Sequence, residues 1–178
     1  MTTDDPETPT PEYRERLSIE LLDYLRNGAE AVINGSFLFR SLDATARQEL
    51  ADRGVVMVFQ AGREVIREGE TGDDFFLMDH GVVEVTTRGP TGPVVLSTLQ
   101  RGAFFGEVAM LTGMPRTATV TALTDASVIR FSREEIDPIL NRDPGARRLL
   151  ETMIEGRARD AVEKVVRASV PASGIDEP

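Results

Sequence analysis

The stretch that decides the fold runs from Phe104 to Val120 and reads FFGEVAMLTGMPRTATV. Gly106 precedes a short apolar run, and a residue without a side chain lets the backbone approach a ligand and open a helical turn. The run that begins at Glu107 is long enough for about one such turn. Residues 113–115 stop it, and an alternating strand follows Arg116. The stretch therefore predicts a glycine-opened helical turn that leads into a β-strand.

The residue types in this stretch suit a ligand that carries both a phosphate and a hydroxyl group. Backbone N–H groups at a helix start favour an anion, and the guanidinium of Arg116 offers a fork of donors that matches phosphate oxygens in pairs. An ionised Glu107 only accepts hydrogen bonds, so its partner must be a donor such as a sugar hydroxyl. The alternative is that Glu107 and Arg116 form a surface ion pair on a domain that binds nothing.

The chain on either side of this stretch predicts a β-rich region. Short strand-like runs alternate with turn residues after Gly54. Many short strands with regular turn signals indicate an antiparallel sandwich, barrel or jelly roll. We interpret the Phe75-Phe76 and Phe104-Phe105 pairs as core and hinge packing. The expected strands cover residues 55–59, 64–67, 75–79, 82–88, 94–99, 117–122 and 127–131.

Helical patterns flank the β-rich region on both sides. Before it, apolar spacings of three and four predict an amphipathic helix over residues 12–33, and a short helix follows over 44–52. After it, Ser132 with Glu135 three residues later predicts a capping box for another short helix. The last helix is expected over residues 144–169. The order is therefore helices, then β-strands, then helices.

Two blocks of the sequence resemble the cyclic nucleotide-binding domain family. This family includes the catabolite activator proteins, the regulatory subunits of cAMP-dependent protein kinase and the cyclic nucleotide-gated channels. Its phosphate-binding cassette reads Phe-Gly-Glu, a short helix and Pro-Arg-x-Ala-Thr-Val, and this chain has FGE at 105–107 and PRTATV at 115–120. The second block, residues 68–85, is similar to the kinase regulatory subunits almost residue for residue. The resemblance covers residues 37–141.

The resemblance implies a role for each candidate site residue. Glu107 would bind the ribose 2′-hydroxyl and Arg116 the exocyclic phosphate oxygens. Asp73 matches the acidic residue that holds the phosphate-binding arginine in the kinase subunits, although capping or plain solvation is an alternative for a carboxylate in a turn. Backbone amides around these residues would complete the phosphate cradle. The candidate ligand-binding set is Gly106, Glu107, Val108, Ala109, Arg116, Thr117 and Ala118.

The resemblance also implies that the last helix folds over the bound base and closes the site. Met153, Ile154 and Arg157 are the candidate lid residues. Gly156 interrupts this helix, and we consider a hinge, close packing on the base and ordinary tolerance for it. Thr117 either bonds a guanine base or bonds a phosphate oxygen and reads no base. We therefore expect both cAMP and cGMP to bind, with a mild lean to cAMP.

The composition argues against several other functions. A formal net charge of −10 over 178 residues disfavours a nucleic-acid partner. The absence of cysteine excludes disulfides and makes a reducing cytoplasm the expected location. We expect no secretory signal and no membrane span. We also expect no metal, no cofactor and no catalysis, because no nucleophile or metal motif occurs and His80 is the single histidine.

We expect a non-enzymatic sensor of cAMP or cGMP that signals to a partner by helix movement. The expected fold is mainly β with flanking α, an antiparallel β-roll (jelly roll) with N-terminal and C-terminal helices packed on it. A protein partner or a second copy would bind through these helices. The alternatives are a catabolite-activator-type transcription regulator without a recognisable DNA-binding domain, and a domain that binds no nucleotide. The expected parts are a disordered tail (1–11), a helical extension (12–36), the ligand-binding roll (37–141), a lid and signalling helix (142–170) and a loose tail (171–178).

Overall fold

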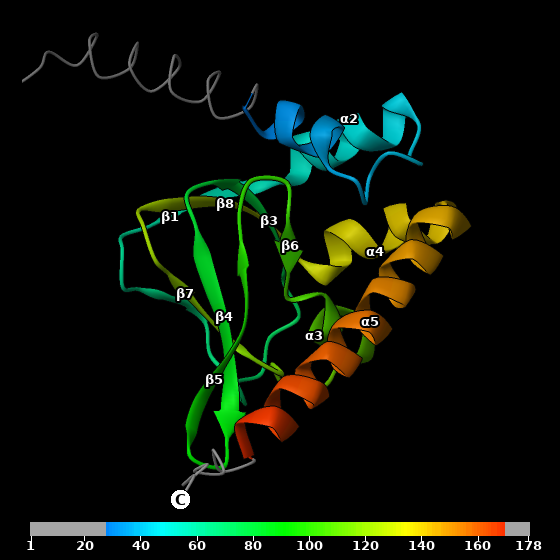
Figure 1. Ribbon diagram of the computed structural model, residues 1–178. Helices are drawn as coiled ribbons and strands as arrows, with labels where there is room; N and C mark the ends of the chain where they lie inside the picture. The colour runs from blue at the N-terminus through cyan, green and yellow to red at the C-terminus, as the bar shows by residue number, and fades with distance from the viewer. Residues whose placement is uncertain (1–27, 170–178) are drawn as a thin grey trace, which may run out of the picture.

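The computed structural model describes residues 28–169. Two antiparallel four-stranded sheets form a roll, with helices at one end and a long helix along one side (Figure 1). One sheet has the order β1 (Val55–Phe59), β8 (Ala126–Phe131), β3 (Phe75–His80), β6 (Phe104–Phe105). The other has the order β2 (Glu64–Ile66), β7 (Thr119–Ala122), β4 (Val83–Gly89), β5 (Gly92–Leu99). The predicted fold class is confirmed.

Helices cover the roll on the side where β3 and β6 lie. They comprise a helical segment over residues 28–35, α2 (Ala44–Arg53), α3 (Glu107–Thr112), α4 (Arg133–Arg142) and α5 (Pro144–Ser169). The capping box that opens α4 is confirmed, because the Ser132 N–H donates to the Glu135 carboxylate at 2.7 Å. The expected tails, and residues 12–27 of the expected first helix, lie outside the described residues.

Two hydrophobic clusters hold the roll and its helices together. One fills the space between the sheets and includes Phe76, Phe105 and Val120. The other joins the first sheet to the helices. The phenylalanine pairs are core residues as predicted, with Phe76 stacked on Phe105 at a centroid distance of 5.0 Å. The helices before α5, and the start of α5, therefore contribute side chains to the packed core.

Some strand boundaries differ from the predicted ones. Phe104 and Phe105 form a short strand, β6, that pairs with β3, whereas the sequence pattern gave only core and hinge packing. Strand β7 begins at Thr119 rather than at residue 117, because the backbone of Arg116 pairs with the loop before β3 instead. His80 ends strand β3 and is not part of the turn that follows. Local patterns miss such pairings because they join distant segments.

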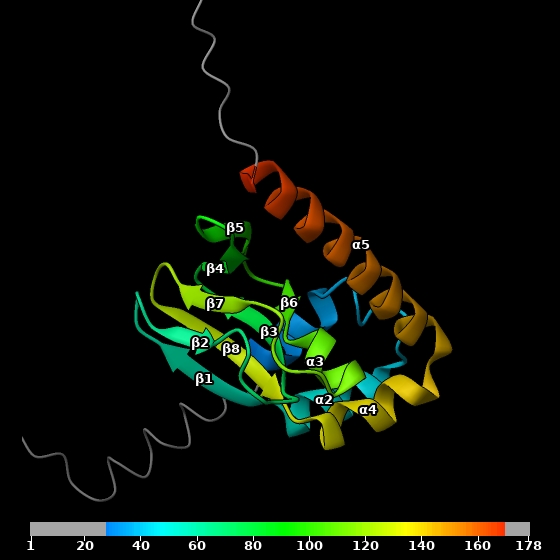
Figure 2. The same ribbon diagram turned by 90° about the horizontal axis from the view of Figure 1, so that it is seen from below.

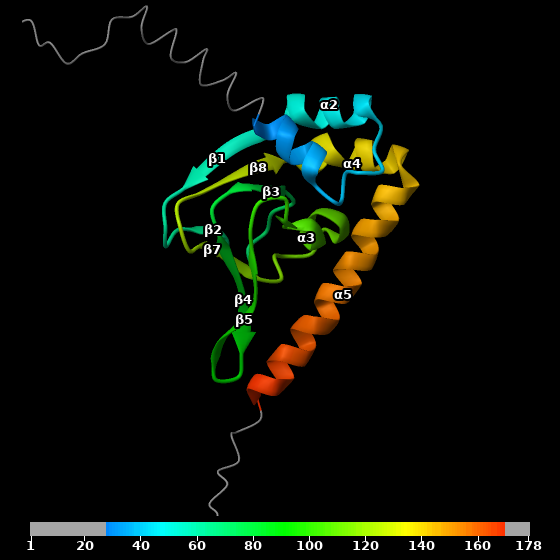
Figure 3. The same ribbon diagram turned by 45° about the horizontal axis from the view of Figure 1, so that its top comes forward.

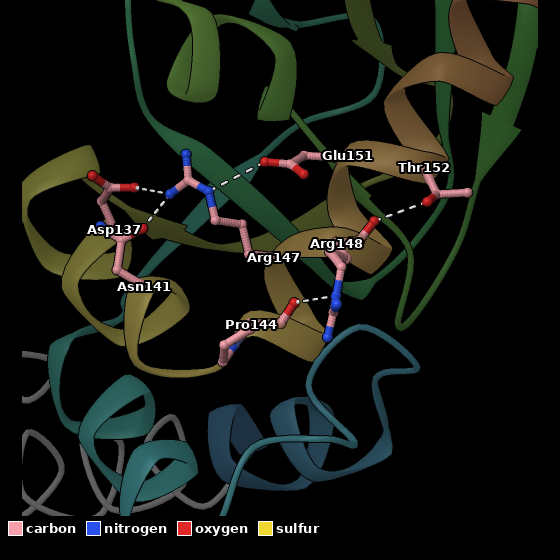
Figure 4. A network of polar contacts seen from close by, with 7 residues as sticks. All are labelled: Asp137, Asn141, Pro144, Arg147, Arg148, Glu151 and Thr152. Atoms are coloured by element: carbon pink, nitrogen blue, oxygen red, sulfur yellow. Dashed lines mark hydrogen bonds and ion pairs between the residues drawn. The ribbon is translucent and has the colours of Figure 1, made fainter.

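The junction between α4 and α5 sets the direction of the long helix. Arg147 of α5 donates to Asp137 of α4 at 3.3 Å and to Glu151 of its own helix at 3.2 Å (Figure 4). It also donates to Asn141 of α4. From this junction α5 runs past α3 toward β5, so that α3 lies between the roll and the helix (Figures 2 and 3). None of the described helices is long and apolar enough to cross a membrane.

Candidate functional site

A cavity of about 360 Å³ lies between α3, α5 and the sheet that contains β4 and β5. The residues predicted to bind a ligand all line it: Gly106, Glu107, Val108, Ala109, Arg116, Thr117 and Ala118. Apolar residues of the strands, such as Val85 and Leu99, form the opposite wall. A mostly apolar cavity with a few charged groups has the composition of a small-molecule site.

Glycine allows the chain to open α3 at the cavity wall. Gly106 is the N-cap of α3 and adopts a left-handed conformation with φ of 83°. A Cβ at this position would lie 2.6 Å from the Asp74 carbonyl oxygen and 2.9 Å from Nη1 of Arg116. Only glycine fits here without displacing its neighbours. The first N–H groups of α3 have no partner within the helix, so they are available to a ligand at this wall.

Arg116 is a buried cation held by main-chain oxygens. Its side chain is 6% exposed, and Nη1 donates to the carbonyl oxygens of Asp74 at 2.8 Å and Gly106 at 3.1 Å. The guanidinium also lies 5.7 Å from the centre of the Phe76 ring. Burial lowers the pKa of Arg116 from its usual value, and Asp74 is the first of the acidic groups that oppose this shift. The group remains charged, because an arginine does not deprotonate in a protein.

Asp73 does not hold Arg116 in the way that the resemblance implies. Within residues 28–169, no hydrogen bond or ion pair joins the two side chains, and Asp73 acts only at longer range by raising the pKa of Arg116. The guanidinium lies so close to the loop backbone that a Cβ at Gly72 would be 3.1 Å from Nη2. The carbonyl oxygen of Asp74 therefore holds the guanidinium in place of the Asp73 carboxylate. The Asp74 carboxylate pairs with Arg130 at 2.9 Å.

Glu107 is buried as well, and its partner comes from the long helix. It is 4% exposed, and Oε1 accepts a hydrogen bond from Nη1 of Arg157 at 2.7 Å. The same nitrogen donates to the Phe104 carbonyl oxygen at 2.9 Å, and the guanidinium lies 4.5 Å from the centre of the Phe104 ring. The alternative of a surface ion pair between Glu107 and Arg116 is wrong, because both residues are buried and Glu107 pairs with Arg157.

The expected lid residues separate into two groups. Ile154 and Arg157 line the cavity, whereas Met153 does not; Met153 and Ile154 both pack against the hydrophobic core. The helix is continuous through Gly156, and a Cβ there would meet no atom within 4 Å, so neither a break nor a close contact marks this glycine.

Further cavity residues on α5 and the strands were not singled out from the sequence. Asp160 and Lys164 follow Arg157 by three and seven residues, which are helical spacings, and this periodicity could have indicated them. Nζ of Lys164 donates to the Leu96 carbonyl oxygen and so attaches the far end of α5 to β5. Thr87 and Ser97 add hydroxyls from β4 and β5. Among the described residues, no cluster of three or more potential metal ligands occurs.

Comparisons with known proteins agree with this geometry. The sequence model of the cyclic nucleotide-binding domain matches residues 56–143. The cAMP-dependent protein kinase regulatory subunit of Yarrowia lipolytica is 41% identical over 103 residues, which are 58% of this chain and 27% of that protein. The chain thus spans about a quarter of this curated relative.

Solved structures give the same match. The regulatory domain of Toxoplasma gondii PKA, crystallised with cAMP, is similar with a TM-score of 0.70 and 24% identity over 77% of this chain and 52% of that one. The cAMP-bound PfPKA-R is similar with a TM-score of 0.61 and 29% identity over 65% and 42%.

Proposed function

Because residues 56–143 belong to the cyclic nucleotide-binding domain family, we propose that this chain binds a cyclic nucleotide in the cavity under α5 and reports it to a protein partner. One observation carries the proposal. A buried acidic acceptor, Glu107, and a buried donor fork, Arg116, line one cavity beside the glycine-opened start of α3. Buried charges are retained where they have a specific task, and a ribose phosphate needs this pair.

Arg116 is the proposed phosphate ligand. Within the described residues its hydrogen bonds engage Nη1, which leaves the donors on Nε and Nη2 for a ligand. The N–H groups at the start of α3 complete the anion site. Because the main chain already fixes the guanidinium, little side-chain entropy remains to be lost when the phosphate binds.

Glu107 is the proposed ribose ligand and links the ligand to α5. A carboxylate has about four acceptor positions, and Arg157 uses one oxygen, so the other oxygen can accept from the ribose 2′-hydroxyl. The ligand and α5 would therefore both bind the side chain of Glu107. A ligand changes the position of α5 only through different affinities for the open and closed arrangements, and this shared carboxylate supplies such a difference.

Thr117 is exposed and lines the cavity, so its hydroxyl can reach a bound ligand. We propose that both cAMP and cGMP bind, with a mild lean to cAMP, because one neutral hydrogen bond does not select strictly between them. The names of the curated relatives make a protein kinase the first partner class to test. We propose no catalysis, no nucleic-acid binding and a cytoplasmic location, in keeping with the net charge of −10 and the absence of cysteine.

Calorimetric titration with cAMP, cGMP, a cyclic dinucleotide and adenosine tests the proposal. We expect saturable binding of the two cyclic mononucleotides and none of adenosine, which lacks the phosphate that Arg116 would hold. Chromatography of the titrated mixture should return the nucleotide unchanged. Absence of heat with both cyclic mononucleotides would contradict the sensor function, and turnover would contradict the non-enzymatic one.

A further inference from the structure

One loop holds the backbone and the side chain of the phosphate-site arginine. This β2–β3 loop covers residues 67–74. Gly69 N–H donates to the Arg116 carbonyl oxygen at 2.8 Å, and Arg116 N–H donates to the Glu70 carbonyl oxygen at 2.8 Å. Together with the bond from Nη1 to the Asp74 carbonyl oxygen, these contacts fix Arg116 from both sides. The position of the guanidinium therefore depends on the position of the loop.

Glu68 attaches this loop to the sheet through its backbone and its side chain. Oε2 accepts from Arg88 N–H of β4 at 2.9 Å and from the Thr87 hydroxyl at 3.3 Å. Its own N–H donates to the Thr119 hydroxyl of β7 at 3.0 Å, and its carbonyl oxygen accepts from Nη2 of Arg88 at 3.3 Å. Hydrogen bonds from a main-chain N–H to a carboxylate are stronger than neutral ones.

Ion pairs hold the two ends of the loop, Glu64 with Arg67 at 2.6 Å and Asp74 with Arg130 at 2.9 Å, but its middle has few other contacts. Gly69 and Glu70 are exposed, so burial does not fix the two residues that pair with the Arg116 backbone. Gly69 also adopts a left-handed φ of 88°, where glycine has more conformational freedom than any other residue. Half-buried Glu68 directly precedes this flexible position. Its bonds to β4 and β7 therefore restrict the loop at the point where it would otherwise move.

We propose that Glu68 is the positioning residue of the phosphate site, an inference that rests on the proposed function. It does not line the cavity, and it acts on the ligand through the loop and Arg116. Removal of its carboxylate frees the loop, so that Arg116 must be ordered again each time a phosphate binds. A purely structural role would lower the stability of the protein and leave its nucleotide affinity unchanged.

Titration of Glu68→Ala, Glu68→Gln and the control Glu64→Ala separates these roles. Glu64 pairs with Arg67 on the exposed surface at 2.6 Å and does not contact Arg116 through its side chain. We expect Glu68→Ala to weaken cAMP binding about tenfold, whereas Glu68→Gln, whose amide oxygen still accepts, should remain within about threefold. In an Arg116→Lys background the loss should shrink, because a point charge needs less orientation than a fork.

Amide hydrogen exchange, followed by NMR in the ligand-free protein, gives a second measurement. Exchange at the N–H groups of Gly69 and Arg116 should rise in Glu68→Ala and stay unchanged in Glu64→Ala. If Glu68→Ala does not fold, Thr119→Val removes the acceptor of the Glu68 N–H and should change affinity and exchange in the same direction. If a folded Glu68→Ala or Thr119→Val protein binds cAMP normally while Arg116→Ala does not, the role of Glu68 is overturned and the proposed function stands. If the wild-type protein binds no cyclic nucleotide, the proposed function and this inference both fall.

Discussion

The cavity has two walls that are held in different ways. The cassette wall, residues 106–118, is attached to the roll by main-chain hydrogen bonds, a left-handed glycine and a buried arginine. The lid wall, residues 154–164 of α5, is attached by the side chains of Arg157 and Lys164. The buried residues of α5 are Ala146 and Leu150, both near its start, and Val162 is 65% exposed. The comparison indicates that the cassette wall is the more firmly held of the two, and that the lid wall can open more easily, since weakly packed segments open first.

The largest expected effect comes from removal of the arginine in the cassette wall. Arg116→Ala should weaken cAMP binding by about a hundredfold or more, because a charge-assisted, paired interaction with phosphate is lost. Arg116→Lys should recover only part of the loss, since an ammonium cannot copy the fork. Calorimetry measures both affinities, and thermal unfolding checks that the variants remain folded. Unchanged affinity in a folded Arg116→Ala protein would remove the cassette wall from the recognition mechanism.

Glu107 of the cassette wall is bonded to Arg157 of the lid wall, so replacement of Glu107 should affect both walls. Glu107→Ala should weaken cAMP binding by about tenfold to thirtyfold, and 2′-deoxy-cAMP binding by less, because 2′-deoxy-cAMP lacks the hydroxyl that would donate to the free oxygen of the carboxylate. Parallel titrations of the two nucleotides measure the difference. If both ligands lose affinity by the same factor, Glu107 holds the lid and does not read the ribose.

Arg157 should have a smaller effect, and one confined to the lid wall. Arg157→Ala removes the bonds from α5 to Glu107 and to the Phe104 carbonyl oxygen, so the closed arrangement becomes less favourable. We expect affinity for cAMP to fall by about threefold to tenfold and amide exchange across residues 154–164 to rise. Arg159→Ala, on the exposed surface of the same helix, is the matched control and should change neither. Equal behaviour of the two variants would show that Arg157 does not hold the lid.

The smallest expected effect concerns the base. One neutral hydrogen bond contributes about 0.5–1.5 kcal/mol, so Thr117→Ala should weaken cGMP binding by roughly tenfold at most and cAMP binding by less. The ratio of the two affinities is the quantity to measure. A parallel fall of both affinities would assign the Thr117 hydroxyl to the phosphate instead of the base.

The sequence predicted the residues of the cassette wall more completely than those of the lid wall, for a physical reason. Residues 106–118 are contiguous, and their glycines, acid and arginine carry residue types that chemistry requires at fixed spacing. The pairing of Glu107 with Arg157 joins residues 50 positions apart, and no local pattern records it. Asp73 was selected for its carboxylate, whereas the contact is made by the Asp74 carbonyl oxygen. A main-chain acceptor is present at every residue, so residue type cannot reveal which one is used.

Contacts between distant segments also explain why some strand boundaries differ from the predicted ones. Alternating patterns and turn residues predicted most strands and the roll they form. The two-residue strand β6 is too short to show alternation, and it exists because Phe104 and Phe105 pair with β3. Residues 117–118 alternate like a strand, but the backbone of Arg116 is bonded to the β2–β3 loop, which delays the start of β7. Tertiary pairing therefore overrides the local pattern at the ligand site.

The buried residues of α5 lie near its start, and the side chains of Arg157 and Lys164 hold the rest of the helix, so α5 could act as a lever when those two contacts break. Its 26 residues extend for about 39 Å at the usual rise per residue. A rotation of about 10° at the α4–α5 junction would move the far end by roughly 7 Å over such an arm. A displacement of that size exceeds the width of a side-chain contact, so a rearrangement of one hydrogen bond at Glu107 can be converted into a change of surface that a second protein can detect.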